Sequence, residues 1–147
     1  MKGRNTRRIL LLAASVFVVA ASLGYYFFNK GPVNVKNASG KKVEATELYQ
    51  AFVSNSIAAQ QNFNGKVLEV KGSVEAVTTN QENEKLVLLK TNESGAYINC
   101  TVEEKELTHL AKGDVVSVKG ICKGIGEAEP DLGIKADLYL TRAYIKR

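Results

Sequence analysis

The chain has 147 residues, 20 of them basic and 15 acidic, and its formal net charge is +5. From Gly31 onward basic and acidic residues number fifteen each, so the whole surplus lies in Lys2, Arg4, Arg7, Arg8 and Lys30. The basic balance therefore gives no evidence for a nucleic-acid partner, and one histidine without a CxxC pair predicts no metal site.

The first element is an apolar run of twenty residues from Ile9 to Phe28, which contains no charged side chain. As a helix it spans about 30 Å, the thickness of a hydrocarbon core. It predicts a transmembrane signal anchor over residues 9–28, after a basic cytoplasmic tail over residues 1–8. Tyr25 and Tyr26 fit the membrane interface, and everything after Phe28 is expected outside the cytoplasm.

A cleaved signal peptide is the alternative interpretation, because it also begins with a basic segment and ends at small residues. Val19-Ala20-Ala21 could serve as the cleavage site, and the remainder would then be a secreted protein. Cleavage would leave four adjacent aromatic residues, Tyr25–Phe28, in water, where they favour aggregation. An uncleaved anchor avoids this exposure, but the sequence leaves both interpretations open.

Residues 29–42 are rich in Gly, Asn, Ser and Lys, which predicts a flexible linker. After this segment Leu48, Phe52 and Ala59 recur at helical spacing. They predict one helix from Val43 to about Gln61, which ends before Asn64-Gly65.

Extended segments follow the helix, with the alternation of apolar and polar residues that is typical of strands. They are Lys66–Thr79, Lys85–Lys90, Ala96–Val102, Asp114–Lys123 and Ile134–Lys146, with a short acidic helix, Glu103–Leu110, after the third. Gly72 interrupts the apolar row of the first segment, where a strongly bent barrel strand would place a glycine. Three strands, a small helix and two strands is the order of an OB-fold. Residues 43–147 are therefore expected to form a mainly β domain, a five-stranded Greek-key barrel with an α-helix before it.

Two cysteines, Cys100 and Cys122, fall on apolar faces of the third and fourth predicted strands. In an exported domain they are free to oxidise, so a disulfide between them is one interpretation. A pair of small buried residues is the other, and the sequence leaves the choice open.

Candidate ligand-binding residues follow from the strand order, because OB-folds bind along strands two and three, between the first and fourth connecting loops. Tyr97 is expected on the outer side of the third strand, and Lys85 begins the second. The fourth loop carries three alternating carboxylates, Glu127, Glu129 and Asp131. Their spacing is not that of an EF-hand, so a solvated loop is preferred over a Ca²⁺ site. Acidic loops beside one aromatic residue also argue against single-stranded nucleic acid.

The sequence predicts no catalytic group and no cofactor. His109 is the only histidine, so it has no second histidine to act with, and it lies on the short acidic helix. The serines occur in neither a GxSxG nor an SxxK setting. Both cysteines are expected to point inward, which disfavours a reactive thiolate. The protein is therefore not expected to be an enzyme.

Three elements carry a family resemblance: Phe63–Gly72 after the helix with Asn55 and Ala59, Cys100 in the third strand, and Gly113–Gly124 with its Gly120-Ile121-Cys122. Together they resemble the tRNA-anti-like family of small bacterial OB-fold proteins, which are often membrane- or lipid-anchored. The resemblance covers roughly residues 43–145. It implies the fold and cysteines at both positions, but it supplies no catalytic residue, and the family's name establishes no RNA activity.

These observations predict a single-pass bacterial membrane protein whose C-terminal domain is periplasmic or otherwise extracytoplasmic. Its expected function is non-catalytic binding of a protein or an envelope polymer, through Tyr97 and the loops Thr79–Glu84 and Gly124–Gly133. The alternative is a structural subunit that assembles with other membrane proteins through its transmembrane helix. Single-stranded nucleic-acid binding is the third interpretation.

Overall fold

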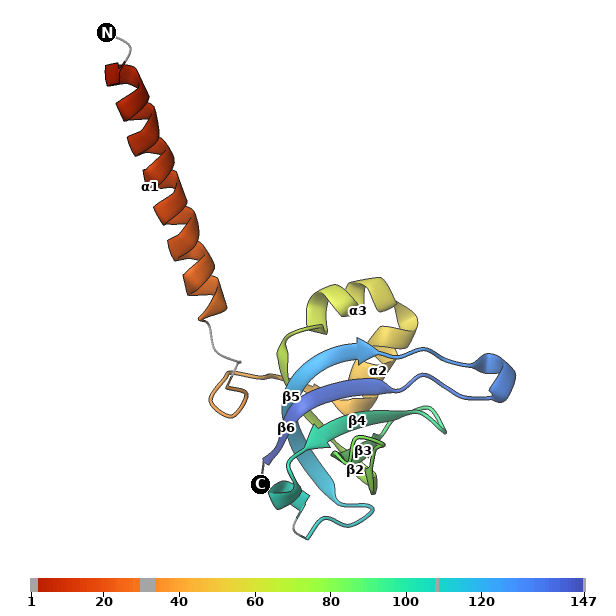
Figure 1. Ribbon diagram of the computed structural model, residues 1–147. Helices are drawn as coiled ribbons and strands as arrows, with labels where there is room; N and C mark the ends of the chain where they lie inside the picture. Colours follow the sequence, from red (N-terminus) through yellow and green to blue (C-terminus); the bar gives the residue numbers. More distant parts are fainter. Residues whose placement is uncertain (1–2, 30–33, 108, 147) are drawn as a thin grey trace. The chain divides into compact units, whose positions relative to one another are not determined.

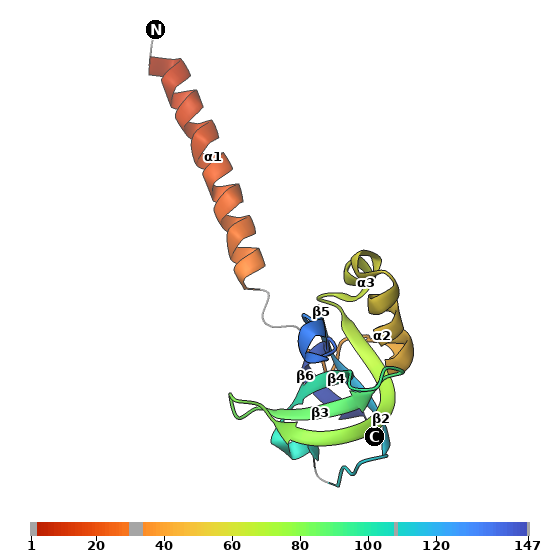
Figure 2. The same cartoon turned by 90° about the vertical axis from the view of Figure 1, so that its right-hand side faces the viewer.

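The computed structural model describes residues 3–29, 34–107 and 109–146, without the side chains of residues 3–12, 27, 104 and 106. The chain divides into two compact units, Met1–Val33 and Asn34–Arg147. Figures 1 and 2 show the secondary structure of both units from two directions.

The first unit contains one helix, α1, over Gly3–Phe28. The predicted helix Ile9–Phe28 lies within it, although the side chains of Ile9–Leu12 lie outside the described part. Among the residues described, no helix is both long enough and apolar enough to cross a membrane.

The second unit is a closed β-barrel. Its strands are β2 (Val67–Thr79), β3 (Lys85–Lys90), β4 (Tyr97–Val102), β5 (Val115–Ile125) and β6 (Leu138–Lys146). They follow the order β2-β3-β4-β6-β5, and β5 pairs with β2 to close the barrel. The β4–β6 pair is parallel and the other pairs around the barrel are antiparallel. This is the topology of an OB-fold, so the predicted five-stranded barrel is confirmed.

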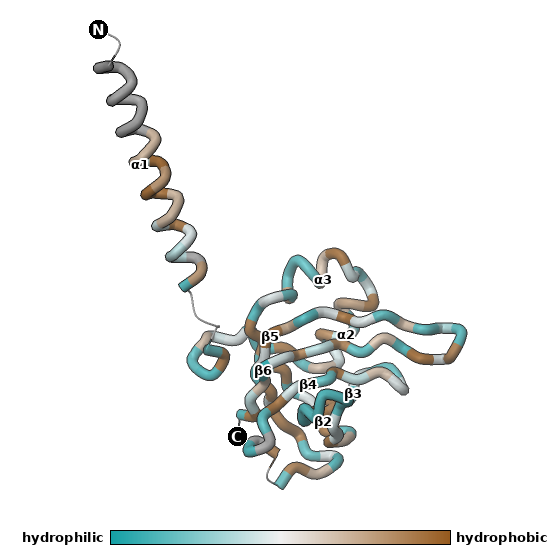
Figure 3. The backbone as a smooth tube through the Cα atoms, viewed as in Figure 1, coloured by the Kyte–Doolittle hydropathy of each residue, from teal (hydrophilic) through white to brown (hydrophobic). Residues whose placement is uncertain are grey.

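Alternation along the strands fills the barrel with apolar side chains. Figure 3 colours the backbone by hydropathy, and hydrophobic and hydrophilic residues alternate along the strands. The core includes Leu68, Val70, Val74, Val87, Leu89, Ile98, Cys100, Val118, Cys122, Leu138 and Leu140. Gly72 lies where α2 meets β2, and a Cβ there would stand 2.8 Å from Cβ of Ala45. The glycine is therefore needed for helix packing, whereas the register of β2 shifts further on, between Val74 and Ala76.

The helix before the barrel differs from the predicted single helix, because it is broken at Asn55. The structure has α2 over Ala45–Ser54 and α3 over Ser56–Phe63. Asn55 has a non-helical backbone conformation, with φ −153° and ψ 85°, and its side-chain oxygen accepts a hydrogen bond from the Ala58 backbone N–H at 3.1 Å. Asparagine is a strong N-cap residue, so it starts a new helix instead of continuing the first one. α2 packs on β1, β2 and β3, and α3 packs on β5.

The predicted flexible linker over residues 29–42 is also corrected, since the second unit already begins at Asn34. Val35 is 2% exposed, and the Lys119 ammonium donates to the Lys36 carbonyl oxygen. Strand β1, Lys41–Glu44, then pairs in parallel with β2. This segment has the polar composition of a linker, but the pairing of β1 with β2 and the burial of Val35 hold it in a defined conformation. Residues 30–33 lie outside the described residues.

The predicted acidic helix Glu103–Leu110 is reduced to a 3₁₀-helix, η1, over Glu104–Leu107. His109 then has a φ of 72°, which no α-helix continues through. A segment of eight residues with three glutamates is too short to form a stable α-helix without strong packing. Thr108 lies outside the described residues.

Candidate binding face

The outer side of β3, β4 and β6 forms a mixed surface between two connecting loops, residues 80–84 and residues 126–137. We call it the outer face. It is formed by Leu86, Leu88 and Lys90 of β3, Tyr97, Asn99 and Thr101 of β4, and Tyr139 of β6. Alternation explains this set, because the residues between them in each strand point into the barrel. In Figure 1 the longer loop extends away from the barrel beyond β5 and β6.

Asp137, the residue before β6, holds this loop to β4. Its Oδ1 accepts the Tyr97 backbone N–H at 2.8 Å, and its Oδ2 accepts the Asn99 side-chain N–H at 2.8 Å. Its backbone oxygen accepts the Gly126 N–H at 2.8 Å from the opposite side of the loop. Hydrogen bonds to a charged acceptor are stronger than neutral ones, so this aspartate fixes the position of the loop base.

Asn99 is the one buried asparagine on this face, and it is only 8% exposed. Its amide nitrogen is satisfied by Asp137. Among the described residues, its Oδ1 is the buried side-chain oxygen or nitrogen that has no hydrogen-bond partner. Buried polar atoms are almost always paired in native proteins, so this oxygen needs an explanation.

Tyr139 lies beside Asn99 in the β4–β6 register and is 43% exposed. Its ring packs against Gly126, where a Cβ would stand 2.9 Å from the ring carbon Cε2. A side chain at Gly126 would therefore push the ring out of place. The glycine permits a flat aromatic residue to lie along the base of the loop.

Two further contacts hold the loop. The Tyr49 hydroxyl of α2 donates to the Ala136 carbonyl oxygen at 3.0 Å, and the Lys135 ammonium pairs with the Glu93 carboxylate at 2.7 Å. Burial, followed by the negative charges of Glu93 and Asp137, raises the pKa of Tyr49 above its usual value. The hydrogen bond to Glu93 raises the pKa of Lys135. The loop base is thus attached to α2, to β4 and to the β3–β4 connection.

The predicted site residues do not all come together. Tyr97 is half-buried at the start of β4, as expected, and lies next to Lys90. Lys85 lies at the other end of β3, roughly 17 Å away along a six-residue strand. Its ammonium donates to the Thr79 hydroxyl at 3.2 Å. Lys85 therefore belongs to the shorter loop and not to the acidic one.

Glu127, Glu129 and Asp131 are all exposed on the longer loop. The backbone of Glu129 pairs with Ile134, and a 3₁₀ turn, η2, forms the tip over Pro130–Leu132. Leu132 is 70% exposed at that tip. No group of three potential metal ligands occurs within the described part of the chain. The carboxylates remain a solvated acidic arm.

Cys100 and Cys122 are free thiols and both are buried, so the structure has the second of the two interpretations, without a disulfide. Each cysteine is paired with Leu140, from opposite sides of β6. Two strand spacings separate them by roughly 9–10 Å, whereas disulfide-bonded Cα atoms are about 4.4–6.8 Å apart. Burial raises the pKa of both thiols.

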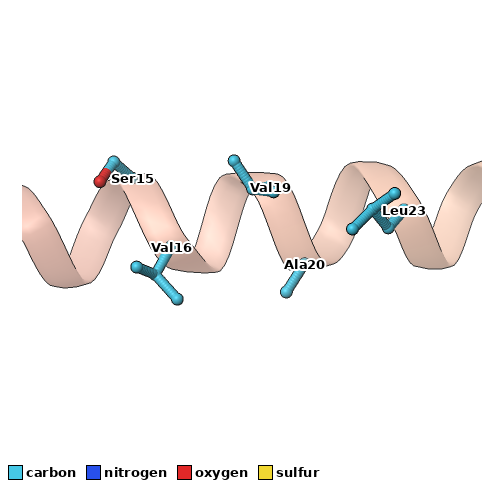
Figure 4. A pocket seen from close by; sticks show the side chains of 5 residues that line it. All are labelled: Ser15, Val16, Val19, Ala20 and Leu23. Carbon is cyan, nitrogen blue, oxygen red and sulfur yellow. The ribbon is translucent and has the colours of Figure 1, made fainter.

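Two hollows are lined by residues outside the two connecting loops. One of about 370 Å³ lies where α2 begins, against Lys71, Ser73 and Lys90. The other is formed on α1 alone, by Ser15, Val16, Val19, Ala20 and Leu23 (Figure 4). This second hollow is a groove between the side chains of one helix, with four apolar residues and one serine. His109, the only histidine, lies exposed in the turn after η1.

Sequence reasoning missed Asn99, Asp137 and Tyr139. The alternation Leu138-Tyr139-Leu140 indicates that Tyr139 points outward. The last strand is predicted to begin at Ile134, so the position of Tyr139 at the start of β6 is not recognised from the sequence. No sequence signal connects Asp137 to Asn99, because 38 residues separate the two side chains.

The barrel, its helix pair and its outer face define an OB-fold protein. The chain belongs to the tRNA_anti-like family, whose sequence profile matches residues 1–130. No curated protein sequence matches it.

One solved structure supports the fold. A lipoprotein of Klebsiella pneumoniae, named for a presumed nucleic-acid-binding role, aligns with a TM-score of 0.56 at 15% identity over 79% of this chain and 99% of its own. At 15% identity this likeness concerns the fold alone. Two further structures align with lower scores. An OBody bound to hen egg-white lysozyme has a TM-score of 0.40 at 24% identity, over 57% of this chain and 84% of its own. Asparaginyl-tRNA synthetase of Entamoeba histolytica has a TM-score of 0.37 at 14% identity, over 56% of this chain and 21% of its own.

Proposed function

We propose that the protein is a non-catalytic binding module that holds a protein or an envelope polymer on its outer face. The observation that carries the proposal is the pair Asn99 and Tyr139. One is a buried amide with an unpaired oxygen, and the other is a large, exposed aromatic residue beside it in register. An unpaired buried acceptor costs the fold free energy, and the exposed part of the Tyr139 side chain contributes nothing to its stability.

The position of the pair adds support. Ligands of OB-folds usually lie across this side of the barrel, between the loops that here are residues 80–84 and 126–137. The longer loop is held at its base by Asp137, Tyr49 and Lys135, so the site is preorganised on one side. Its tip presents Leu132 and three carboxylates to solvent. Such a surface suits a protein or a neutral polymer better than a polyanion.

We also propose that α1 anchors the module in a bacterial membrane, with the barrel outside the cytoplasm. Apolar side chains project in successive directions around this helix, and Val16, Phe17, Val18 and Val19 are all more than half exposed. An all-round apolar helix is stable only when hydrocarbon or other helices cover it. Alkaline carbonate should leave the full chain in the membrane pellet. Extraction into the supernatant would contradict the anchor, and an intact mass shortened at Ala21 would show a cleaved signal peptide instead.

Photocrosslinking in intact cells tests the binding proposal. A photoreactive amino acid in place of Tyr139 or Tyr97 is expected to capture a partner or envelope material. The matched control replaces Tyr144, which lies on the same strand but at the other end, beside Lys119. Equal capture from all three positions would contradict the proposal. Capture only from positions on α1 would favour the structural-subunit alternative.

Single-stranded nucleic-acid binding is a second candidate, and the name of the Klebsiella lipoprotein is the observation that favours it. Tyr97 and Tyr139 could stack on bases, but the neighbouring loop is acidic. Binding of labelled oligonucleotides at low salt, weakening steeply as salt rises, would support this candidate. Absence of binding at low salt would exclude it.

A further inference from the structure

We propose that the ligand of the outer face is a neutral glycan. In this proposal Asn99 Oδ1 accepts a hydrogen bond from a sugar hydroxyl while the Tyr139 ring packs on the face of the same sugar. The inference rests on the proposed binding function and adds the chemical class of the ligand. Three independent observations lead to it: the orientation of the amide, the charge balance of the face, and the exposed ring.

The orientation of the Asn99 amide is fixed by its neighbour. Exchanging the amide oxygen and nitrogen would place the oxygen 2.8 Å from a carboxylate oxygen of Asp137, and the two acceptors would repel each other. The nitrogen must therefore face Asp137. The oxygen points away from it, at the angle of the planar amide, and offers a lone pair to a donor that the described residues do not provide.

The charges on this face argue against an anionic ligand, which would meet Asp137 and the acidic loop. Lys90 is exposed directly across from Tyr97 and would repel a cationic group placed beside it. The Asn99 amide oxygen is itself uncharged, so a neutral donor is sufficient for it. A hydroxyl group donates a hydrogen bond without carrying charge and meets this requirement.

The aromatic residue supplies a matching apolar contact. The face of an aromatic ring is electron-rich, and the C–H groups on one side of a sugar ring carry partial positive charge, so the two attract each other. Tyr139 has an exposed ring, and the half-buried Leu88 lies across β4 from it, on the other side of Asn99. In the strand register Asn99 thus lies between Leu88 and Tyr139.

Asn99 Oδ1 is covered in the free protein, so binding requires one side chain to move. Tyr139 is the neighbour with room to do so, because nearly half of its surface faces solvent. Rotation of this ring about its first side-chain torsion needs no change in the strand. Exposed side chains make such rotations rapidly.

The test uses the full chain in a polyoxyethylene detergent, since a detergent with a sugar headgroup would compete. The probes are a β-1,4-linked N-acetylglucosamine tetramer and maltotetraose, titrated to millimolar concentration. The side-chain amide signals of Asn99 and the backbone signal of Tyr139 are followed by NMR. Binding of either probe is expected to shift both signals and to leave those of Asn92, an exposed loop amide, unchanged.

Substitutions separate recognition from structure. Asn99→Leu keeps the volume but removes both the acceptor and the N–H that donates to Asp137, and Tyr139→Ala removes the ring. Each is expected to weaken probe binding by about tenfold. Asn92→Leu and Tyr144→Ala are the matched controls and are expected to change it less than twofold. Circular dichroism verifies that each variant is folded. Unchanged affinity in the folded Asn99→Leu variant would overturn the role of the oxygen.

Failure of the glycan inference and failure of the binding function give different results. If neither probe shifts the Asn99 signal while Tyr139 still captures a protein in cells, the glycan class is wrong and the binding module stands. If no probe binds and capture from Tyr139 equals that from Tyr144, both proposals fall. Probe binding together with capture of envelope material supports both.

Discussion

The two sides of β4 are made from six consecutive residues, yet they do different things. Ile98, Cys100 and Val102 point into the barrel and are almost completely buried. Tyr97, Asn99 and Thr101 point outward. The Tyr97 backbone N–H and the Asn99 side-chain N–H both donate hydrogen bonds to the carboxylate of Asp137, which lies 38–40 residues further along the chain. The inner side stabilises the fold through packing, whereas the outer side has polar contacts that packing does not require. Residues that stabilise the core and residues of the proposed binding face can therefore be substituted separately on one strand.

The largest loss of stability is expected from a substitution on the inner side of β4. Ile98→Ala removes a fully buried side chain from the core and should lower the free energy of unfolding by about 3–4 kcal/mol. Thr101→Ala, three residues later on the outer side, should cost less than about 1 kcal/mol. Urea unfolding followed by circular dichroism measures both. Equal costs would mean that the two sides are not energetically distinct.

Asp137→Ala should have the largest effect on the outer side. It removes the acceptor of the Tyr97 backbone N–H and of the Asn99 amide, which leaves two poorly exposed donors unpaired. A loss of about 2–3 kcal/mol is expected, together with faster hydrogen exchange at Tyr97. Asp131→Ala, in the same loop but exposed at its tip, is the control. A neutral effect of Asp137→Ala would show that the loop base is held by Tyr49 and Lys135 alone.

Cys100→Ser places a hydroxyl in the core, where the thiol behaves as a small apolar group. A loss of about 1–2 kcal/mol is expected, and Cys100→Ala should cost less than Cys100→Ser. Thiol counting on protein denatured without reductant, after isolation from cells, should give two free thiols. A count of zero would mean that a disulfide forms and that the strands around Leu140 rearrange.

The smallest effect is expected at the exposed ion pair of Lys112 and Glu75. The hydrogen bond from Lys112 holds the pKa of Glu75 below its ordinary 4.5, so the pair stabilises the fold above that pH. The contribution is lost as the pH falls through the lowered pKa. The Lys112 pKa is raised, so the contribution is also lost at strongly alkaline pH.

Lys112→Met should therefore reduce the urea midpoint slightly at pH 7 and not at pH 3. Lys123→Met, which removes an exposed lysine that does not contribute to the lowered Glu75 pKa, should show no such difference between the two pH values. A variant that is equally destabilised at both pH values would point to lost packing of the lysine stem and not to its charge.

The barrel could be predicted from the sequence, because the alternation of apolar and polar residues indicates which side chains of each strand are buried. Leu68 and Val70, or Ile98 and Cys100, need no knowledge of their neighbours to be placed inside. Only part of the outer face could be predicted from the sequence. Tyr97 could be placed outward by the same alternation, but its partner Asp137 depends on the β4–β6 register. At Asn55 a local interaction decides the structure. The apolar stripe continues past this residue and predicts one helix, but the hydrogen bond from the Ala58 N–H to the Asn55 side chain caps a second helix there.

Pairing of β6 with both β4 and β5 has a consequence for how the chain becomes structured. Until the last strand is in place, two neighbouring strands keep open edges, and Leu138 and Leu140 are missing from the core. The contacts that close the barrel join distant parts of the chain, which makes such closure slow compared with helix formation. A chain still being made cannot complete either its core or its outer face. The outer face therefore forms only after β6 has joined the barrel.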